Sequence, residues 1–188
     1  MENQFYSLQS AFKSNSIGLE PIEPFDDVSF FTGRNGRYLF KCVFGNKKYD
    51  ILTGGFAYIF IVSEKFIDAL GNNFSGWKQV PLEIQSENGE SMEGYFGLAV
   101  KGVCGPIKNE LSKKVILPPR TKNGPSRSGY IGLYFDESTW DGSDVFSPAN
   151  SNYIFITGKV KNELERSNLT NILIEPIGEI ENLSVDLF

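Results

Sequence analysis

Two short stretches of this chain share a pattern of apolar and polar residues that narrows the folds open to it. Residues 59–65 read IFIVSEK and residues 154–160 read IFITGKV. Each begins with an apolar run, which is typical of a strand covered on both faces. The likeness continues, because FSGW at residues 74–77 aligns with LTNI at residues 169–172. The pattern predicts two similar strand–helix–strand units.

Helix signals follow the apolar run in both units, which we place at about residues 57–84 and 153–177. In the first unit, Ser63 can accept a hydrogen bond from an unpaired N–H group of the first helical turn. Phe66 then begins an apolar helix face, and Gly71 suits the left-handed conformation that often ends a helix. A chance match is the alternative, since strand–helix–strand units are common and Ile-Phe-Ile is easily matched.

The rest of the chain carries mainly strand signals. Runs of aromatic and β-branched residues predict strands at residues 37–44, 48–52, 58–62, 77–84, 92–102, 115–117, 129–135, 153–157 and 171–177. A turn signal at Gly45 predicts that the first two strands form a hairpin, whereas the prolines within residues 1–33 predict an extended lead-in. We therefore expect a single α+β domain, residues 1–188, with a mixed, mostly antiparallel sheet and two short helices.

The chain of 188 residues contains no histidine. This excludes nucleophiles activated by a histidine base, the His-Glu-x-x-His zinc site and the histidine-containing zinc deaminases. Chemistry based on carboxylates, on lysine or tyrosine, or on Mg²⁺ remains open. Gly54 and Gly55 precede a strand instead of a helix, and no Gly-Lys-Ser/Thr motif is present, so the sequence indicates no phosphate-binding loop. We expect no cofactor.

The cysteines and the apolar runs bear on the cellular compartment. Cys42 and Cys104 are the only two cysteines, which is too few for a secreted disulfide scaffold, so we expect two buried free thiols in a reducing compartment. The first residues lack the basic and apolar regions of a signal peptide, and the longest apolar run, residues 56–62, is too short to span a bilayer. We expect a cytoplasmic protein without a membrane partner.

Residues 136–146 form the segment richest in potential contact groups. Four carboxylates lie around a turn there, but their spacing is not that of an EF-hand loop, and we expect no metal site. Two interpretations remain: the acids cap turns while Trp140 anchors the loop, or the segment is an exposed tryptophan–acid patch for a protein partner. The candidate partner-binding residues are Asp136, Glu137, Trp140, Asp141 and Asp144.

A basic stretch occupies residues 101–127. Its cations are Lys101, Lys108, Lys113, Lys114, Arg120, Lys122 and Arg127, against Glu110 alone. One interpretation is a phosphate-attracting stripe, and the other is a solvated basic hairpin. No aromatic residue lies among these cations, and no motif of a nucleic-acid-binding fold is recognisable, so we expect no nucleic acid partner.

The last part of the chain resembles a known family. Residues 140–146 (WDGSDVF), residues 154–157 (IFIT), a short helix and residues 169–172 (LTNI) resemble the C-terminal part of immunity proteins from bacterial polymorphic-toxin and contact-dependent systems. The resemblance is confined mainly to residues 140–177. It implies a cytoplasmic protein that binds and neutralises a cognate toxin domain, in a family that has no catalytic residues to carry over.

Three functions stand as expectations. The first is a stoichiometric toxin inhibitor, which the net charge of −5 would steer toward a basic toxin such as a nuclease. The second is an accessory or regulatory binding module without catalysis. The third is a carboxylate- or Mg²⁺-dependent enzyme, which would need a deep pocket containing Asp136, Asp141 or Asp144 with a raised pKa. The resemblance and the charge favour the first, so we expect a protein that is not an enzyme.

Overall fold

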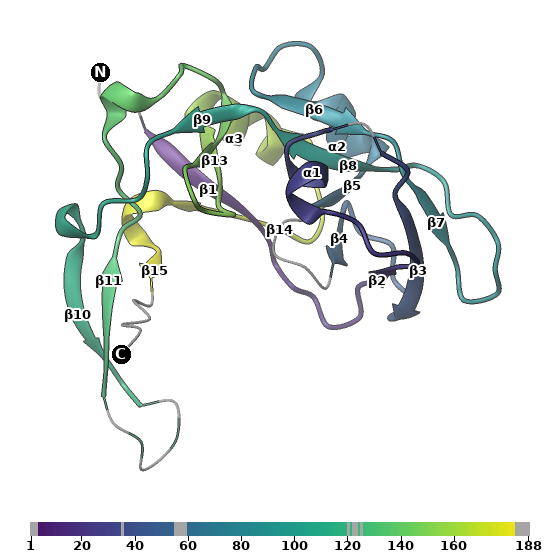
Figure 1. Ribbon diagram of the computed structural model, residues 1–188, viewed down its shortest axis with the longest axis horizontal. Coiled ribbons are helices and arrows are strands. Elements are labelled where there is room, and N and C mark those ends of the chain that lie inside the picture. The colour runs from purple at the N-terminus through teal and green to yellow at the C-terminus, as the bar shows by residue number, and fades with distance from the viewer. Residues whose placement is uncertain are drawn as a thin grey trace.

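The fold is described from a computed structural model (Figure 1), which describes residues 4–34, 36–54, 60–119, 121, 124 and 126–182. Its strands are β1 (Phe5–Ser10), β2 (Gly18–Pro21), β3 (Leu39–Phe44), β4 (Ile51–Gly54), β5 (Ile61–Ser63), β6 (Trp77–Val80), β7 (Glu83–Gln85), β8 (Tyr95–Val100), β9 (Gly102–Cys104), β10 (Lys113–Leu117), β11 (Arg127–Ile131), β12 (Val145–Pro148), β13 (Ile154–Thr157), β14 (Ile172–Pro176) and β15 (Glu181–Asn182). Its helices are α1 (Asp27–Phe31), α2 (Glu64–Leu70) and α3 (Gly158–Arg166), with single 3₁₀ turns η1 (Asn109–Leu111), η2 (Glu137–Thr139) and η3 (Ile177–Glu179).

The strands form three sheets whose neighbours run mostly antiparallel, which confirms the α+β class. A seven-stranded sheet has the order β6-β8-β5-β4-β2-β3-β7, and a five-stranded sheet has the order β14-β1-β13-β12-β9. The third sheet, β10-β11-β15, forms an arm that projects from the body in Figure 1. No helix among the described residues is long and apolar enough to cross a membrane.

The two predicted strand–helix–strand units are present and have the same pairing pattern. In unit one, β5–α2–β6, the strands β5 and β6 both pair antiparallel with β8, which lies between them. In unit two, β13–α3–β14, both strands pair antiparallel with β1 in the same way. Trp77 faces Val100 in the first unit, and its predicted counterpart Ile172 faces Ser10 in the second. Each unit is therefore a split β-α-β arrangement.

The duplication extends beyond the predicted units to five strands on each side. β4 pairs with β5 as β12 pairs with β13, and the registers Ile51–Val62 and Val145–Ile156 correspond. Next to these, β2 pairs parallel with β4, and β9 pairs parallel with β12. The orders β6-β8-β5-β4-β2 and β14-β1-β13-β12-β9 thus run in step. The central strand comes after its unit in the first copy and before its unit in the second.

The central core lies between the two units. Phe66 and Leu70 of α2, together with Val160 and Leu164 of α3, are almost fully buried there, and the two helices contact each other. The strands add the residues that face the helices, namely Tyr6, Leu8, Ile51, Val62, Leu98, Val100, Val145, Ile154 and Ile156. Successive side chains of a strand point to opposite faces of the sheet. The strand residues that alternate with those of the central core therefore pack in two outer cores.

The predicted signals for α2 are confirmed. The hydroxyl of Ser63 accepts a hydrogen bond from the N–H group of Phe66 at 3.2 Å. The helix ends at Gly71, which has a φ of 49° and donates its N–H group to the carbonyl of Ile67. The start of α3 differs, because the side chain of its N-cap residue Thr157 makes no capping bond.

The predicted extended lead-in over residues 1–33 is wrong, as is the expectation of only two helices. Its described part contains β1, β2 and α1, and β1 lies inside the five-stranded sheet. β1 was missed because it carries polar residues in buried places, including Ser7, which has no exposed surface. The short helix α1 is set by Asp26, whose carboxylate accepts the N–H group of Val28.

Two strand predictions also need correction. The predicted hairpin at Gly45 does not form, since β3 pairs with β2 and β7, whereas β4 pairs with β2 and β5. The predicted strand at residues 77–84 is divided into β6 and β7, which lie at opposite edges of their sheet. Part of the predicted strand at residues 58–62 lies outside the described residues, and its described end forms β5.

Candidate functional site

Asp136, the first of the predicted contact residues, caps a 3₁₀ turn. Its carboxylate accepts a hydrogen bond from the N–H group of Ser138 at 3.1 Å and forms an ion pair with Lys108 at 3.3 Å. The hydrogen bonds from Ser138, followed by the nearby Lys108, hold the pKa of Asp136 below its ordinary value. Glu137 lies in the same turn with an exposed side chain.

Asp141 fastens the following loop to the edge of the five-stranded sheet. Its carboxylate accepts the N–H groups of Val103 and Ser143, each at 3.0 Å, and its own N–H group donates to the carbonyl of Val103. Burial opposes ionisation of this carboxyl group, but the hydrogen bonds from Ser143 and Val103 outweigh burial and lower its pKa. The outer edge of β9 is therefore covered by this loop.

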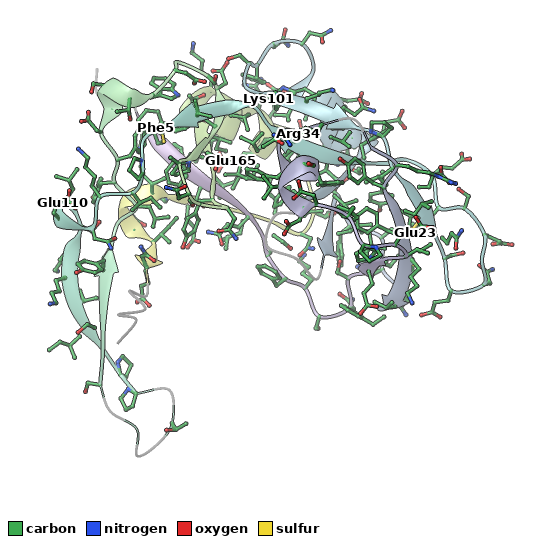
Figure 2. The ribbon with its side chains drawn as sticks, in the orientation of Figure 1. Phe5, Glu23, Arg34, Lys101, Glu110 and Glu165 are labelled. Carbon is green, nitrogen blue, oxygen red and sulfur yellow. The ribbon has the colours of Figure 1, made fainter. Side chains whose placement is uncertain are left out.

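Trp140 anchors the same loop in the outer core of unit two. Its ring meets the ring of Phe5 edge-on, with centroids 5.1 Å apart, and lies 5.5 Å from the ring of Phe146. Its indole N–H group donates to the carbonyl of Ser143 at 3.0 Å. Figure 2 labels Phe5, which lies at the start of β1. Trp140 is thus an internal contact residue.

Asp144 joins the two units. One carboxylate oxygen accepts the N–H group and the hydroxyl of Ser75, at 3.0 Å and 3.1 Å. The other oxygen accepts the hydroxyl of Thr157, at 3.3 Å. Thr157 precedes α3 in unit two, and Ser75 lies in the turn that follows α2 in unit one. Asp144 therefore ties the start of one helix to the turn after the other.

Asp50 makes the corresponding contacts for the other helix: it binds Ser63, which precedes α2, and Thr170, which lies in the turn after α3. One of its carboxylate oxygens accepts the N–H group and the hydroxyl of Thr170, both at 2.7 Å, and the other accepts the hydroxyl of Ser63, also at 2.7 Å. Burial alone would raise the pKa of Asp50. The hydrogen bonds from Ser63 and Thr170 outweigh burial, so the pKa lies below its ordinary value. We call Asp50 and Asp144, with their four partners, the paired aspartate clasps.

The Asp50 clasp was not predicted from the sequence, although the sequence contains a signal for it. Each aspartate directly precedes the strand that pairs with the first strand of its unit, namely β4 in Asp50-Ile51 and β12 in Asp144-Val145. The partners Ser75 and Thr170 occupy the same place in the aligned FSGW and LTNI motifs. Extending the internal alignment backward to β4 and β12 pairs the two aspartates.

The described residues do not provide the catalytic constellations considered above. No group of three or more metal-ligating side chains is present in the part of the chain that the structure describes. Asp136, Asp141 and Asp144 cap turns or join units, and the pKa values of the first two are lowered instead of raised. The carboxylate-enzyme hypothesis required the opposite, so these three residues do not support it.

The two thiols differ from each other. Cys104 is buried, and its burial, helped by the nearby charge of Asp141, raises the pKa of the thiol to about 12. Cys42 is only partly buried, so the prediction that both thiols are buried holds for Cys104 alone. Burial and the charge of Glu87 raise the pKa of Cys42 as well. Neither thiol is disposed to act as a thiolate nucleophile at neutral pH.

A shallow pocket of about 220 Å³ lies beside the end of α1. It is lined by Gly33, Arg34, Gly36, Lys78, Gln79, Val80 and Pro81. The ammonium group of Lys78 donates to the carbonyl of Gly33 at 3.2 Å, and that of Lys101 donates to the carbonyl of Thr32 at 3.0 Å. Figure 2 shows Arg34 and Lys101 close together in this region. These lysines support the helix end, and no carboxylate is among the lining residues that the structure describes.

Large apolar side chains are exposed on loops, on the strands β3 and β9, and on the arm. The exposed fractions are 81% for Ile116, 68% for Phe12, 56% for Val103, 54% for Leu111 and 52% for Phe44. On the arm, Lys113 and Lys114 are exposed together with Ile116, which agrees with a solvated basic hairpin.

Neither a known protein family nor a curated protein matches this chain. The site must therefore be judged from its own geometry. The described carboxylates that were candidates for chemistry are engaged within the fold, and the exposed apolar groups include Phe12 between β1 and β2, Phe44 at the end of β3 and Ile116 on the arm.

Proposed function

We propose that this chain is a cytoplasmic immunity protein that binds a cognate bacterial toxin domain and neutralises it by stoichiometric contact. The proposal rests on one observation, which is that the candidate catalytic side chains and the exposed apolar side chains have different roles. Candidate catalytic carboxylates serve the scaffold, whereas Phe12, Phe44 and Ile116 present apolar surface to the solvent. Exposed aromatic and aliphatic side chains of this size are typical anchors of protein interfaces.

The resemblance over residues 140–177 supports the proposal at the level of the scaffold. This segment includes β12, β13, α3 and β14, and three of its residues, Asp144, Thr157 and Thr170, belong to the paired aspartate clasps. These three motif residues therefore help to hold the two units together. Because partner contacts belong on exposed groups, we place the toxin-binding surface outside these motifs.

Charge gives a second line of support. The chain carries a net charge of −5, and an acidic protein is drawn toward a basic partner before the two surfaces touch. Among the predicted partner residues, Glu137 is exposed and can contribute to this attraction. Steering of this kind raises the association rate and weakens as salt is added.

Co-expression with the product of the adjacent upstream gene tests the proposal. We expect the toxin domain alone to stop growth, the pair to grow normally, and the purified pair to migrate as one species on a sizing column. A catalytically silent version of the toxin should still form the complex. If growth is not rescued and the purified proteins elute separately, the proposal is wrong.

An accessory or regulatory binding module is the second candidate, and one observation favours it. Strand β10 is an edge of the three-stranded arm and carries the exposed Ile116, a combination that allows pairing with another copy or another protein. Such a module would self-associate through the arm. A molar mass that rises with concentration in light scattering, and falls back in Ile116→Lys, would support this candidate over the first.

A further inference from the structure

The two copies of the fold differ at the connection that follows the central strand. After β8, the central strand of the first copy, the chain passes into β9 of the second copy through Lys101 alone. After β1, the central strand of the second copy, the chain passes into β2 of the first copy through residues 11–17, which Figure 1 shows extending past the end of β1 before the chain returns. The scaffold can therefore be built without this loop. Added loops on a rigid scaffold are a common place for binding groups.

The loop begins on a fixed base. Asn171 is 2% exposed, and its carbonyl and side-chain oxygens accept the N–H groups of Ala11 and Lys13, each at 3.1 Å. Its side-chain amide donates to the carbonyl of Ile51 at 2.7 Å. One buried residue thus holds the backbone on both sides of Phe12. The direction in which Phe12 projects is set by the fold.

Phe12 itself is unfavourable for folding on two grounds. Its φ is 50°, a left-handed conformation that bulky residues rarely adopt, and 68% of its surface is exposed. A glycine or asparagine would take this backbone conformation more readily, and a polar side chain would suit the exposure better. Strained residues held by their surroundings are often functional. Stability therefore gives no reason for phenylalanine here.

Two lysines lie in and beside the loop that carries Phe12. The ammonium groups of Lys13 and Lys47 each lie 5.1 Å from the ring centre of Tyr49, and the hydroxyl of Tyr49 donates to the side chain of Asn15 in the loop. Within the described ranges neither lysine belongs to an ion pair. We call Phe12, Lys13 and Lys47 the Phe12 patch.

We propose that Phe12 is the anchor with which this protein docks on the toxin domain, and that the ring enters an apolar pocket bordered by carboxylates. The inference rests on the proposed function and locates its surface. A rigidly presented aromatic side chain is a typical interface hot spot, because its burial removes a large apolar area from water and costs little conformational entropy. Lys13 and Lys47 would then meet anionic groups at the pocket rim, where partial desolvation strengthens the attraction.

A protein pocket fits the patch better than a nucleic acid. Single-stranded nucleic acids are bound by aromatic side chains arrayed along a basic groove, whereas this patch has two lysines on an acidic protein and one projecting ring. The net negative charge of the chain attracts a basic toxin from a distance. Lys13 and Lys47 act only at contact, where they set the orientation in which the two proteins dock. The two effects act at different distances.

Affinity measurements on the complex test the inference. The toxin domain is titrated against the wild-type chain, Phe12→Ala, Phe12→Gly and the control Val103→Ala, which truncates an apolar side chain that is 56% exposed beside the predicted acidic segment. We expect both Phe12 variants to lose at least about 30-fold in affinity. The control should change by less than about threefold. Thermal unfolding should show equal or higher stability for Phe12→Gly, because glycine accepts the left-handed backbone.

The outcomes separate the inference from the proposed function. If the wild-type chain does not bind the toxin, the proposed function fails first. If the wild type binds and the Phe12 variants bind equally well, the function stands and the anchor is wrong. A lower unfolding temperature for both variants would show a structural role and overturn the inference. Wild-type binding to a labelled single-stranded oligonucleotide, lost in Phe12→Ala, would overturn the partner class.

Discussion

At the scale of single residues, the carboxylates of Asp50 and Asp144 link parts of the chain that are far apart in sequence. Asp50 accepts hydrogen bonds from Ser63 and Thr170, and Asp144 accepts them from Thr157 and Ser75. Charge-assisted hydrogen bonds of this kind are stronger than neutral ones. These two aspartates therefore act as scaffold residues, and Asp144 does so at a position where the sequence alone suggested a contact patch.

We predict that Asp50→Asn lowers the free energy of unfolding by about 1–3 kcal/mol at pH 7, because the amide turns N–H groups toward the donors of Ser63 and Thr170. Urea unfolding followed by circular dichroism measures the change. The matched control is Asp68→Asn on the exposed side of α2, which should stay within about 0.5 kcal/mol of the wild type. Equal stability of both variants would show that the clasp contributes nothing.

The same carboxylate predicts a pH dependence. The pKa of Asp50 is below its ordinary value of 3.8 in the folded protein, so its contribution to stability is fully present above that value. The contribution is lost as the pH falls through the lower, folded-state pKa. We therefore expect the stability difference between the wild type and Asp50→Asn to shrink between about pH 5 and pH 2. Urea midpoints measured across this range check it, and a constant difference would contradict it.

At the scale of elements, the turns after α2 and α3 each place a residue with positive φ next to a backbone carbonyl group of the other unit, and the two turns use different residues there. Gly76 and Asn171 align, and both have positive φ, 86° and 59°. A side chain at Gly76 would meet the carbonyl oxygen of Val145 at 2.0 Å, so glycine is required there. At Asn171 the equivalent carbonyl, that of Ile51, receives the side-chain amide at 2.7 Å.

We predict that Asn171→Gly lowers the free energy of unfolding by about 1–3 kcal/mol, although glycine suits the backbone, because buried hydrogen bonds to Ile51 and Lys13 are lost. Amide hydrogen exchange at Lys13 should also become faster. Asn168→Gly is the matched control, since Asn168 has a φ of 49° but is exposed. That variant should be neutral or slightly more stable, and a similar loss in both variants would argue against a special role for Asn171.

How far the elements could be predicted depends on whether their signals were local. The α2 helix has a local cap at Ser63 and a local stop at Gly71, and both were predicted. Strand β1 could not be found in the same way, because its burial depends on pairing with β13 and β14 from the other end of the chain. The acidic segment was recognised as rich in contact groups, but the partners of Asp144 lie in Ser75 and Thr157, which only the fold brings together.

At the scale of the whole molecule, the two copies share one core. Leu70 from unit one and Leu164 from unit two are each 1% exposed in the same cluster, between helices that touch. The clasps of Asp50 and Asp144 add bonds in both directions across the same boundary. Neither copy can close its central face without the other. The duplicated halves should therefore unfold together, despite their similar architecture.

The two tryptophans test this cooperativity, because Trp77 lies in β6 of unit one and Trp140 packs in the outer core of unit two. We predict that Trp140→Phe and Trp77→Phe, each with one remaining tryptophan, show fluorescence midpoints in urea that coincide with circular dichroism. Adding Leu164→Ala should lower stability by about 2–5 kcal/mol through the cavity it leaves, and should shift both fluorescence signals equally. If the Trp77 signal keeps its midpoint while the Trp140 signal moves, the copies unfold independently and the shared core does not couple them.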